Sequence, residues 1–393
     1  MALASTVLTD AESHTWLESF QLAAKDVGAP SPFSMHKLRL RGGLRDGVDM
    51  IEIDNGRFFF AVLPTRGMGI WYGALRQDDD SLVRIGWNSP VKGPVHPQFV
   101  PLGEPSGLGW LNGFDELLVR CGLVSNGAPD FDDKGQLLYP LHGHIANRPA
   151  HRVEVGYDDA TEELVVTGVV DETRFHFAKL RLTTTIRTKL GESGFRIHDE
   201  ITNLSALPSG IQLLYHVNFG PPLLDAGARV VAPIKSVVPR DARAVEGIGQ
   251  WNHFAAEEPG YAEQVYFAEL IGGRVGKTQA MLRNAHGTLG ASLHYGVKEL
   301  PCFTLWKDTA AEPDGYVTGL EPGLNFPNPR TYEESQGRVL MLKPGETRSF
   351  DVQLEIHGTP KEVEAATTAI TALQGGVRPR VFEKPQKGWS AAG

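Results

Sequence analysis

Alternation of apolar and polar residues marks several stretches of the chain as β-strands. In the segment 178–190, the positions Ala178, Leu180, Leu182 and Ile186 alternate with polar neighbours. This period of two is typical of a strand that buries one face and exposes the other. The same kind of pattern continues in the segments 195–203, 211–219, 291–297 and 348–358.

Turn signals separate these stretches. Asn55-Gly56 lies between two apolar runs, and this dipeptide is a strong β-hairpin signal. The chain contains 44 glycines and 26 prolines, which indicates frequent turns. Many short strands, few helices and no alternation of strand with helix predict a mainly β protein, built as a large antiparallel β-sandwich.

Helical signals occur only at the two ends. Thr9 and Glu12 fit a capping box, and Trp16 and Phe20 lie one turn apart, so the segment 1–35 is interpreted as an N-terminal helical extension. The central segment 36–358 is then the β-domain.

The segment 359–393 is interpreted as a C-terminal helix and tail. Thr359 is the expected N-cap, with Glu362 as its capping-box partner, and Gly375 follows the helix. Val363, Ala366, Ile370 and Leu373 would form its apolar face. The tail after Gly376 is basic, and we expect it to pack loosely or to reach a partner subunit, so a homodimer is one expectation.

Composition narrows the class of protein. The 393 residues are 41% hydrophobic and 22% charged, as in ordinary globular proteins. A net charge of -9 argues against nucleic acid and anionic membranes as main partners. No apolar stretch is long enough to span a bilayer, the first residues do not resemble a signal peptide, and Cys121 and Cys302 stand alone. These features predict a cytoplasmic location.

Two regions rich in glycine and proline are candidates for ligand binding. Arg66 follows an apolar run and is flanked by Gly67 and Gly69, which would leave its guanidinium accessible, unless it is a solvated turn residue. The stretch 76–150 has few strand signals, and loops of this length inside a compact domain are usually functional.

The segment "LHGHIANRP" places His142, His144, Asn147 and Arg148 close together. Imidazoles two residues apart could bind a metal, but no glutamate follows them at the spacing that a cupin site requires. The same donors and acceptors suit sugar hydroxyl groups. Histidines hydrogen-bonded in a polar loop are the third interpretation.

Two further residues could transfer protons. His216 ends an apolar strand and is followed by Asn218, and an ordinary histidine titrates near neutral pH. Glu321 lies between a short apolar run and the stiff segment "PGLNFPNP". Either residue alone could instead be a satisfied core histidine or a surface charge.

Together these segments resemble the aldose 1-epimerase (galactose mutarotase) superfamily. The "TNLS" turn, the strand ending at His216 and the late "LEPGLNFPN" segment carry the resemblance, which covers about residues 40–357. "LHGHIANRP" resembles that superfamily's histidine-bearing segment. Other segments, such as "GWNSPVKGPVHPQF", are not usual in the best-known mutarotases and suggest a separate bacterial branch.

The resemblance implies a β-supersandwich with an open sugar cleft and short flanking helices. It implies Glu321 as general base and His216 as general acid, with Arg66 and His142 binding the sugar. The complete set of expected substrate-binding residues is Arg66, His142, His144, Asn147, Arg148, Asn218 and Asn325. Such chemistry needs no metal and no cofactor, and the partner is a small-molecule sugar or sugar acid.

Two other functions remain open at this stage. The same pair could isomerise an aldose to a ketose or epimerise a keto sugar, because that reaction also needs one base and one acid. A sugar-binding protein without turnover is the third possibility, with tryptophans such as Trp71, Trp87, Trp110 and Trp306 as stacking platforms or as core residues.

Overall fold

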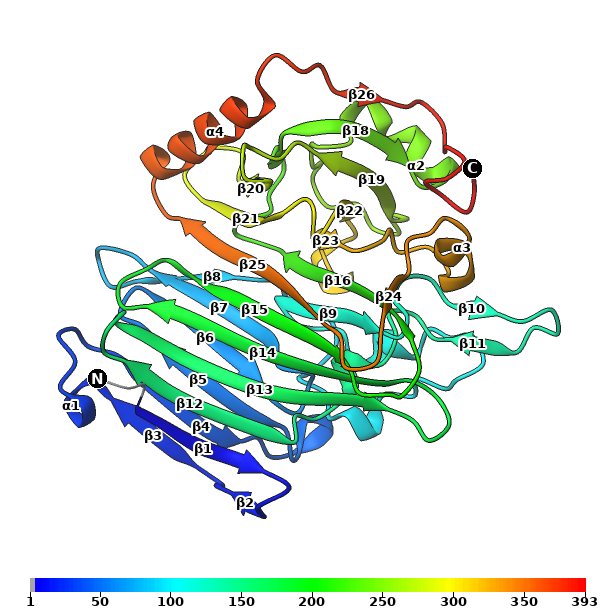
Figure 1. The fold of residues 1–393 in the computed structure, drawn as a ribbon. Helices are drawn as coiled ribbons and strands as arrows, with labels where there is room; N and C mark the ends of the chain where they lie inside the picture. The colour runs from blue at the N-terminus through cyan, green and yellow to red at the C-terminus, as the bar shows by residue number, and fades with distance from the viewer. Residues whose placement is uncertain (1–3) are drawn as a thin grey trace.

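Two large β-sheets form the body of the protein. The computed structural model describes residues 4–393. In Figure 1, β13 (Glu163–Thr173), β14 (Lys179–Lys189) and β15 (Gly194–Asn203) cross in front of β6 (Phe58–Leu63), which belongs to the second sheet. The predicted mainly β fold with large antiparallel sheets is confirmed.

The first sheet has ten strands, all paired antiparallel to their neighbours. Their spatial order is β17 (Arg229–Val231), β20 (Lys277–Arg283), β21 (Gly290–Gly296), β25 (Thr347–His357), β15, β14, β13, β12 (Arg152–Asp158), β1 (Ala4–Asp10) and β2 (Thr15–Trp16).

The second sheet has fourteen strands. Its main path runs β26 (Arg380–Val381), β18 (Ile234–Pro239), β19 (Gln264–Leu270), β22 (Cys302–Asp308), β23 (Val317–Gly323), β16 (Ser209–Phe219), β9 (Leu118–Leu123), β7 (Gly69–Arg76), β6, β5 (Asp49–Asp54), β4 (Ser34–Arg39) and β3 (Phe20–Ala23). Two short strands join it from the side: β24 (Leu340–Leu342) pairs with β16 and β8 (Leu82–Ile85) pairs with β7. A separate two-stranded ribbon consists of β10 (Asp130–Phe131) and β11 (Leu137–Tyr139).

The main core lies between the two sheets. Leu180, Leu182 and Ile186 of β14 are buried there together with Phe60 of β6 and Tyr215 of β16. Their polar neighbours in β14 are only half-buried. The alternation of apolar and polar residues in the sequence therefore corresponds to a sheet with one buried face and one more exposed face.

The predicted N-terminal helix is wrong. Residues from Ala4 to Asp10 form β1, which extends the first sheet by pairing with β12. The Asp10 carboxylate accepts hydrogen bonds from the backbone N–H groups of Glu12 and Ser13, so the acid-rich stretch makes a turn. Helix caps and turns favour the same residue types. Pairing of this segment with the edge of β12 stabilises the strand and turn rather than a helix. A single short helix, α1 (Ala24–Val27), lies in this part of the described chain.

The predicted C-terminal helix is confirmed as α4 (Pro360–Gln374). Its capping box is formed, because Thr359 Oγ1 accepts from Glu362 N at 3.3 Å while the Glu362 carboxylate accepts from Thr359 N at 3.0 Å. Val363, Ala366 and Ile370 are buried on its inner face. Two shorter helices, α2 (Ala242–Glu246) and α3 (Arg330–Ser335), connect strands. Within residues 4–393, no helix is long and apolar enough to cross a membrane.

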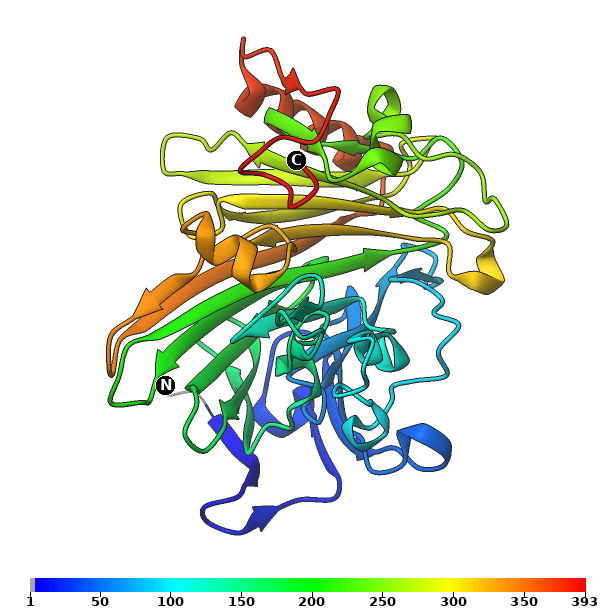
Figure 2. The same ribbon diagram turned by 90° about the vertical axis from the view of Figure 1, so that its right-hand side faces the viewer.

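The glycine-rich region 76–150 covers the face of the second sheet that is turned away from the first. Trp87, Trp110 and Phe114 come from its loops and pack on Cys121 of β9 and Leu214 of β16 in a second apolar cluster. The side view shows these loops in front of the second sheet, beside its green and orange strands (Figure 2). This arrangement encloses the polar residues that lie on the same face.

Candidate active site

His216 and Glu321 are brought together by strand pairing. β16 and β23 are antiparallel neighbours, with Val217 opposite Leu320 and Asn218 opposite Gly319. This register places His216 opposite Glu321 with both side chains on one face of the sheet. The distance from His216 Nε2 to Glu321 Oε1 is 3.2 Å.

Aromatic rings surround this pair. The rings of Phe114, Trp306 and Trp110 have their centroids 5.2, 5.4 and 6.2 Å from that of His216. The His142 ring lies edge-on at 5.3 Å. His216 is 5% exposed and Glu321 is 2% exposed. The pair therefore lies in a largely dry environment in which proton positions depend on a few specific partners.

The protonation of His216 follows from its contact with Asn218. Asn218 Nδ2 donates to the Glu116 carbonyl oxygen at 3.0 Å, which orients Oδ1 of the amide toward His216 Nδ1 at 2.6 Å. Since that oxygen can only accept, Nδ1 carries a proton. In the neutral ring, Nε2 then presents its lone pair to Glu321.

Burial shifts both groups toward their uncharged forms. It lowers the pKa of His216 from 6.5 to about 4, with the contact to Asn218 acting in the opposite direction. Burial raises the pKa of Glu321 well above its ordinary value, Glu263 raises it further, and Arg240 lowers it. Burial thus favours the neutral imidazole of His216 and the protonated carboxyl of Glu321, with opposing atoms 3.2 Å apart.

Arg66 is buried and is linked to the pair through Glu116 and Asn218. Its Nε and Nη2 atoms donate to Glu116 Oε1 at 2.9 and 2.6 Å, Nη2 also donates to the Gly113 carbonyl at 2.7 Å, and Nη1 donates to Asn147 Oδ1. The expectation of an accessible guanidinium is wrong. Gly67 allows a close approach instead, because a Cβ there would lie 2.3 Å from the Ile145 carbonyl oxygen. Arg66 fixes Glu116, whose carbonyl orients Asn218.

Only part of the "LHGHIANRP" segment reaches the pair. His142 lies against Trp110, with ring centroids 4.6 Å apart, and its buried Nδ1 has no hydrogen-bond partner. Burial and the nearby His216 lower the pKa of His142 well below its ordinary value. The half-exposed side chain of His144 lies 3.9 Å from Glu172 instead, and Arg148 is exposed. Among the described residues, no three His, Cys, Asp or Glu side chains are placed to hold a metal ion.

Asn218 and Asn325 are both engaged within the protein. Asn325 Oδ1 accepts from Asn126 Nδ2 at 2.9 Å, and Asn325 Nδ2 donates to the Phe326 carbonyl at 2.8 Å. These bonds fix the loop that follows Glu321. Direct contact of either asparagine with a sugar stays a prediction, as it does for Arg66, Asn147 and the histidine segment.

Two charged residues near the pair were not found from the sequence. Glu263 Oε2 accepts from Trp306 Nε1 at 2.7 Å, and Glu263 Oε1 accepts from Arg240 Nη2 at 2.9 Å. Arg240 follows β18, Glu263 precedes β19 and Trp306 lies on β22, so their contact depends on the pairing of three strands. No local motif marks them. We call Arg240, Glu263 and Trp306 the site wall.

A glycine allows the side chains of the pair to pack closely against the backbone of β23. A Cβ added to Gly319 would lie 2.5 Å from Glu321 Oε1, 3.1 Å from His216 Cε1 and 3.3 Å from the Trp306 ring. The hydroxyl of Thr304, which is opposite Glu321 on β22, is buried without a partner. The site thus combines a buried acid–histidine pair, unsatisfied polar atoms and aromatic faces, which suit a small polar ligand.

Comparison with known proteins places the chain in a family. Residues 45–356 match the family described as domain of unknown function DUF4432. A crystal structure from Klebsiella pneumoniae, described as a "putative aldose 1-epimerase", is 34% identical, covers 98% of this chain and 99% of its own, and superposes with a TM-score of 0.93. No curated protein matches the sequence.

A more distant structure shares only the fold. A galactose mutarotase-like protein from Clostridium acetobutylicum is 17% identical, with 83% of this chain and 98% of its own chain aligned at a TM-score of 0.55. The resemblance stated from the "LEPGLNFPN" and "TNLS" segments is therefore confirmed. The protein belongs to the DUF4432 family and has the galactose mutarotase-like fold of the aldose 1-epimerase superfamily.

Proposed function

We propose that the protein is a sugar isomerase of the aldose 1-epimerase type. The observation that carries this proposal is the buried His216–Glu321 pair, in which Nε2 and Oε1 lie 3.2 Å apart. Interconversion of anomers needs one group that accepts a proton while another donates one, and the net charge of the pair does not change.

Ring opening would use the pair as follows. Glu321 takes the proton from the anomeric hydroxyl, while His216 gives the proton on Nε2 to the ring oxygen as the bond between that oxygen and the anomeric carbon breaks. This requires the form in which the proton lies on His216 Nε2, and that form is reached by transfer from Glu321 within the pair. Rotation of the open-chain carbonyl and reversal of both transfers give the other anomer.

The surrounding side chains support a sugar ligand. Trp306 and Phe114 present apolar ring surface beside His216, which suits the C–H faces of a pyranose. The unpartnered His142 Nδ1 and Thr304 Oγ1 can satisfy hydroxyl groups. We propose that the ligand is a small-molecule sugar or sugar acid and that no metal or other cofactor takes part.

The charge of the sugar is a separate question. Arg66 is fully engaged by Glu116, and Arg330 donates to the Val124 carbonyl and lies over the Tyr139 ring. Arg148 is exposed, so none of these arginines contributes an unpaired buried charge beside the pair. A panel of neutral aldoses and uronates, tested together, would decide between the two sugar classes.

The decisive experiment is anomeric-exchange NMR on such a panel with the wild type and two variants. Glu321→Gln and His216→Asn should each lower the exchange rate about 10²–10⁴-fold, the usual contribution of a proton-transfer group. His198→Asn is a matched control, because His198 forms a surface pair with Asp351 at 2.8 Å. Near wild-type rates in both site variants, with folded proteins, would contradict the proposal.

One observation favours a second candidate, an aldose–ketose isomerase or an epimerase of keto sugars. The raised pKa of Glu321 makes its carboxylate a stronger base, which suits removal of a carbon-bound proton. Substrate-dependent incorporation of deuterium from D₂O at carbon would support it, because anomer exchange breaks no C–H bond. Tight sugar binding without either reaction would identify a non-catalytic binding protein.

A further inference from the structure

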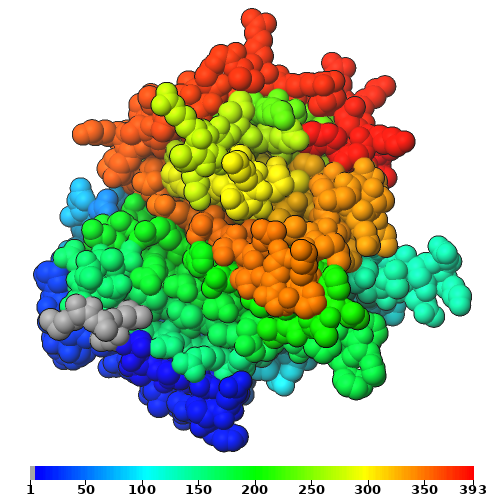
Figure 3. All heavy atoms as spheres, in the orientation of Figure 1, coloured from blue at the N-terminus to red at the C-terminus, as the bar shows by residue number. Residues whose placement is uncertain are grey.

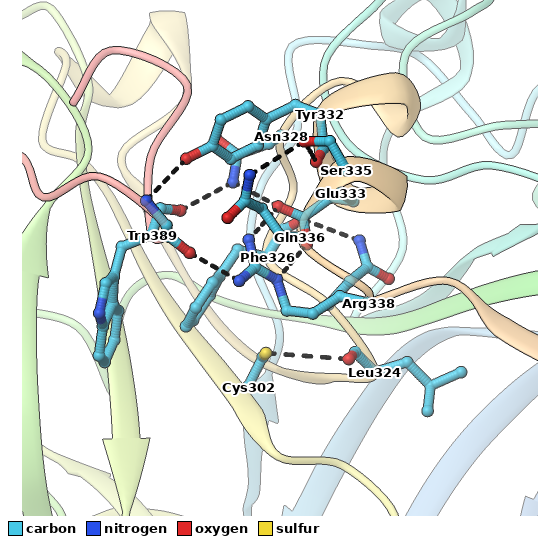
Figure 4. Close-up of polar contacts among 12 residues, drawn as sticks. Cys302, Leu324, Phe326, Asn328, Tyr332, Glu333, Ser335, Gln336, Arg338 and Trp389 are labelled. Carbon is cyan, nitrogen blue, oxygen red and sulfur yellow. Dashed lines mark hydrogen bonds and ion pairs between the residues drawn. The ribbon is translucent and has the colours of Figure 1, made fainter.

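The C-terminal segment 382–392 is anchored to the loop that follows Glu321. The Trp389 ring stacks on Phe326 with centroids 5.2 Å apart and an interplanar angle of 22° (Figure 4). Asn328 Nδ2 donates to the Trp389 carbonyl at 2.9 Å, and Ala391 N donates to Asn328 Oδ1 at 3.0 Å. These contacts use both ends of one buried amide.

A second set of contacts holds the same segment. Tyr332 Oη donates to the Ser390 carbonyl at 2.8 Å and accepts from Gly388 N at 3.2 Å. Arg338 Nη1 donates to the Gly388 carbonyl at 2.6 Å, and its Nε donates to the buried Glu333 at 2.5 Å. Of the two alternatives expected for the tail, loose packing does not hold for residues 388–391, and contact with a partner subunit stays a prediction. Figure 3 shows the tail, in red, lying against the adjacent surface.

The segment also contacts the site wall by two routes. The buried Ser390 Oγ donates to the Arg240 carbonyl, and the Arg240 side chain holds Glu263. Trp389 and Trp306 both pack against one small apolar cluster. The cluster consists of Val265, Phe267, Cys302 and Phe326. Both routes end at Trp306, whose ring lies 5.4 Å from that of His216.

We propose that Trp389 and Ser390 are positioning residues for the candidate active site. They hold the wall of Arg240, Glu263 and Trp306 against the His216–Glu321 pair, which keeps water out and fixes the surroundings of the pair. This proposal deepens the proposed function, because a positioning role matters only if the pair reacts. The structural part of the proposal can be tested without any substrate.

The expected consequence follows from solvation. His216 is kept uncharged by burial, and the titratable groups nearest to it are Glu321 from β23 and His142 from the loop before β12. Glu263 and Arg240 act on Glu321 from β19 and β18. If the wall loosens and water enters, the charged imidazolium becomes less unfavourable, so the pKa of His216 rises toward its ordinary value.

The test compares Trp389→Ala and Ser390→Ala with conservative and remote controls. Trp389→Phe keeps an aromatic ring and Ser390→Thr keeps the hydroxyl, so both should behave like the wild type. Phe33→Ala is the matched remote control, because Phe33 stacks on Tyr157 at 5.2 Å and 27° in the main core. The readouts are thermal unfolding, the titration of the His216 ring by NMR in the absence of sugar, and kcat and KM for anomer exchange.

We expect both alanine variants to raise the pKa of His216 by about one unit or more. We expect them to lower kcat about tenfold or more, since small misplacement of reacting groups is costly. Phe33→Ala should lower the unfolding temperature without either change. An unchanged His216 titration in Trp389→Ala and in the milder Ser390→Ala would overturn the proposal. If no sugar reacts with the wild type, the proposed function fails, and the ring titration still decides the positioning role.

Discussion

Oδ1 of Asn218 lies 2.6 Å from Nδ1 of His216, and this contact determines which nitrogen of the imidazole faces Glu321. The asparagine is itself oriented by the Glu116 carbonyl, and Glu116 is held by Arg66. A line of buried contacts thus leads from Arg66 to the His216–Glu321 pair. Arg66 and Asn218, which were predicted to bind substrate, therefore orient the His216 ring.

Replacing Asn218 by alanine should impair proton transfer more than it impairs folding. Without Oδ1, the neutral His216 ring can place its proton on either nitrogen, and only one tautomer presents a lone pair to Glu321. We expect kcat to fall about 10-fold to 100-fold, within the range of a proton-transfer contribution. Nitrogen chemical shifts of the His216 ring should show a mixture of tautomers.

Asn203→Ala is the control for that experiment. Asn203 is also fully buried, and its Nδ2 donates to the Leu207 and Leu342 carbonyls at 2.9 and 3.0 Å. Its replacement should destabilise the fold while leaving kcat and the His216 tautomer unchanged. Equal losses of kcat in both variants would show that Asn218 acts only through stability.

Gly319→Ala should disturb the pair directly. The added methyl group would lie 2.5 Å from Glu321 Oε1, so the carboxylate must move from its position beside His216. We expect a destabilisation of about 1–3 kcal/mol, as for other overpacked sites, and a large loss of activity. Gly249→Ala, at an exposed glycine with no atom within 4 Å of the new methyl group, should change neither. A fully active Gly319→Ala enzyme would contradict the close contact.

Stability should depend on the protonation of His216 in acid. Its pKa is about 4 in the folded protein and about 6.5 when unfolded, so between these values the unfolded chain binds a proton that the folded chain does not. The stabilisation is complete above pH 6.5 and is lost as the pH falls toward 4. The shift corresponds to about 3 kcal/mol.

Chemical denaturation at several pH values can measure this effect. Glu321 has a raised pKa and acts in the opposite direction at higher pH, so the comparison is best made between Glu321→Gln and the double variant His216→Gln/Glu321→Gln. On going from pH 7 to pH 4, the free energy of unfolding of the double variant should rise by about 3 kcal/mol relative to that of Glu321→Gln. A difference that stays constant with pH would show that His216 titrates normally in the folded state.

The sequence was most informative where local signals and long-range packing agree. The Asn55-Gly56 hairpin joins β5 to β6, and the Thr359–Glu362 capping box starts α4, as predicted. The capping signal at Thr9 was misleading because pairing of β1 with β12 supplied more backbone hydrogen bonds than an isolated helix could retain. Tertiary pairing therefore overrode a weak local preference.

The same distinction explains what was found of the site. His216 and Glu321 lie at strand positions followed by unusual turns, and the resemblance to a known superfamily linked them before their contact was seen. Arg240 and Glu263 have no such mark, since only the pairing of β18, β19 and β22 brings them to Trp306. Residues whose role comes from sheet topology cannot be recognised from their neighbours in the chain.

Activity should survive removal of metal ions. His142 is enclosed by the rings of Trp110 and His216, while His144 lies beside Glu172, so the two imidazoles have different surroundings. A catalytic zinc site typically requires three protein ligands. We expect unchanged exchange rates after exhaustive chelation and no stoichiometric transition metal in the purified protein. Loss of activity that zinc or manganese restores would contradict this expectation and favour the isomerase alternative.

The pH dependence of kcat/KM should lack the step that an ordinary histidine would produce. This parameter reports the ionisation of the free enzyme, in which burial lowers the pKa of His216 to about 4 and raises that of Glu321 well above its ordinary value. The neutral imidazole therefore persists through the range in which an ordinary histidine titrates, and the titrations of the two groups belong to the pair as a whole. We expect kcat/KM to show no step near pH 6.5 and to decline as the pH falls through about 4, where His216 takes up a proton. The measurement is anomer exchange across this range, with His198→Asn as the control for surface histidines. An inflection near pH 6.5 that is retained in this control would show that His216 is solvated in the working enzyme and that the aromatic enclosure does not set its pKa.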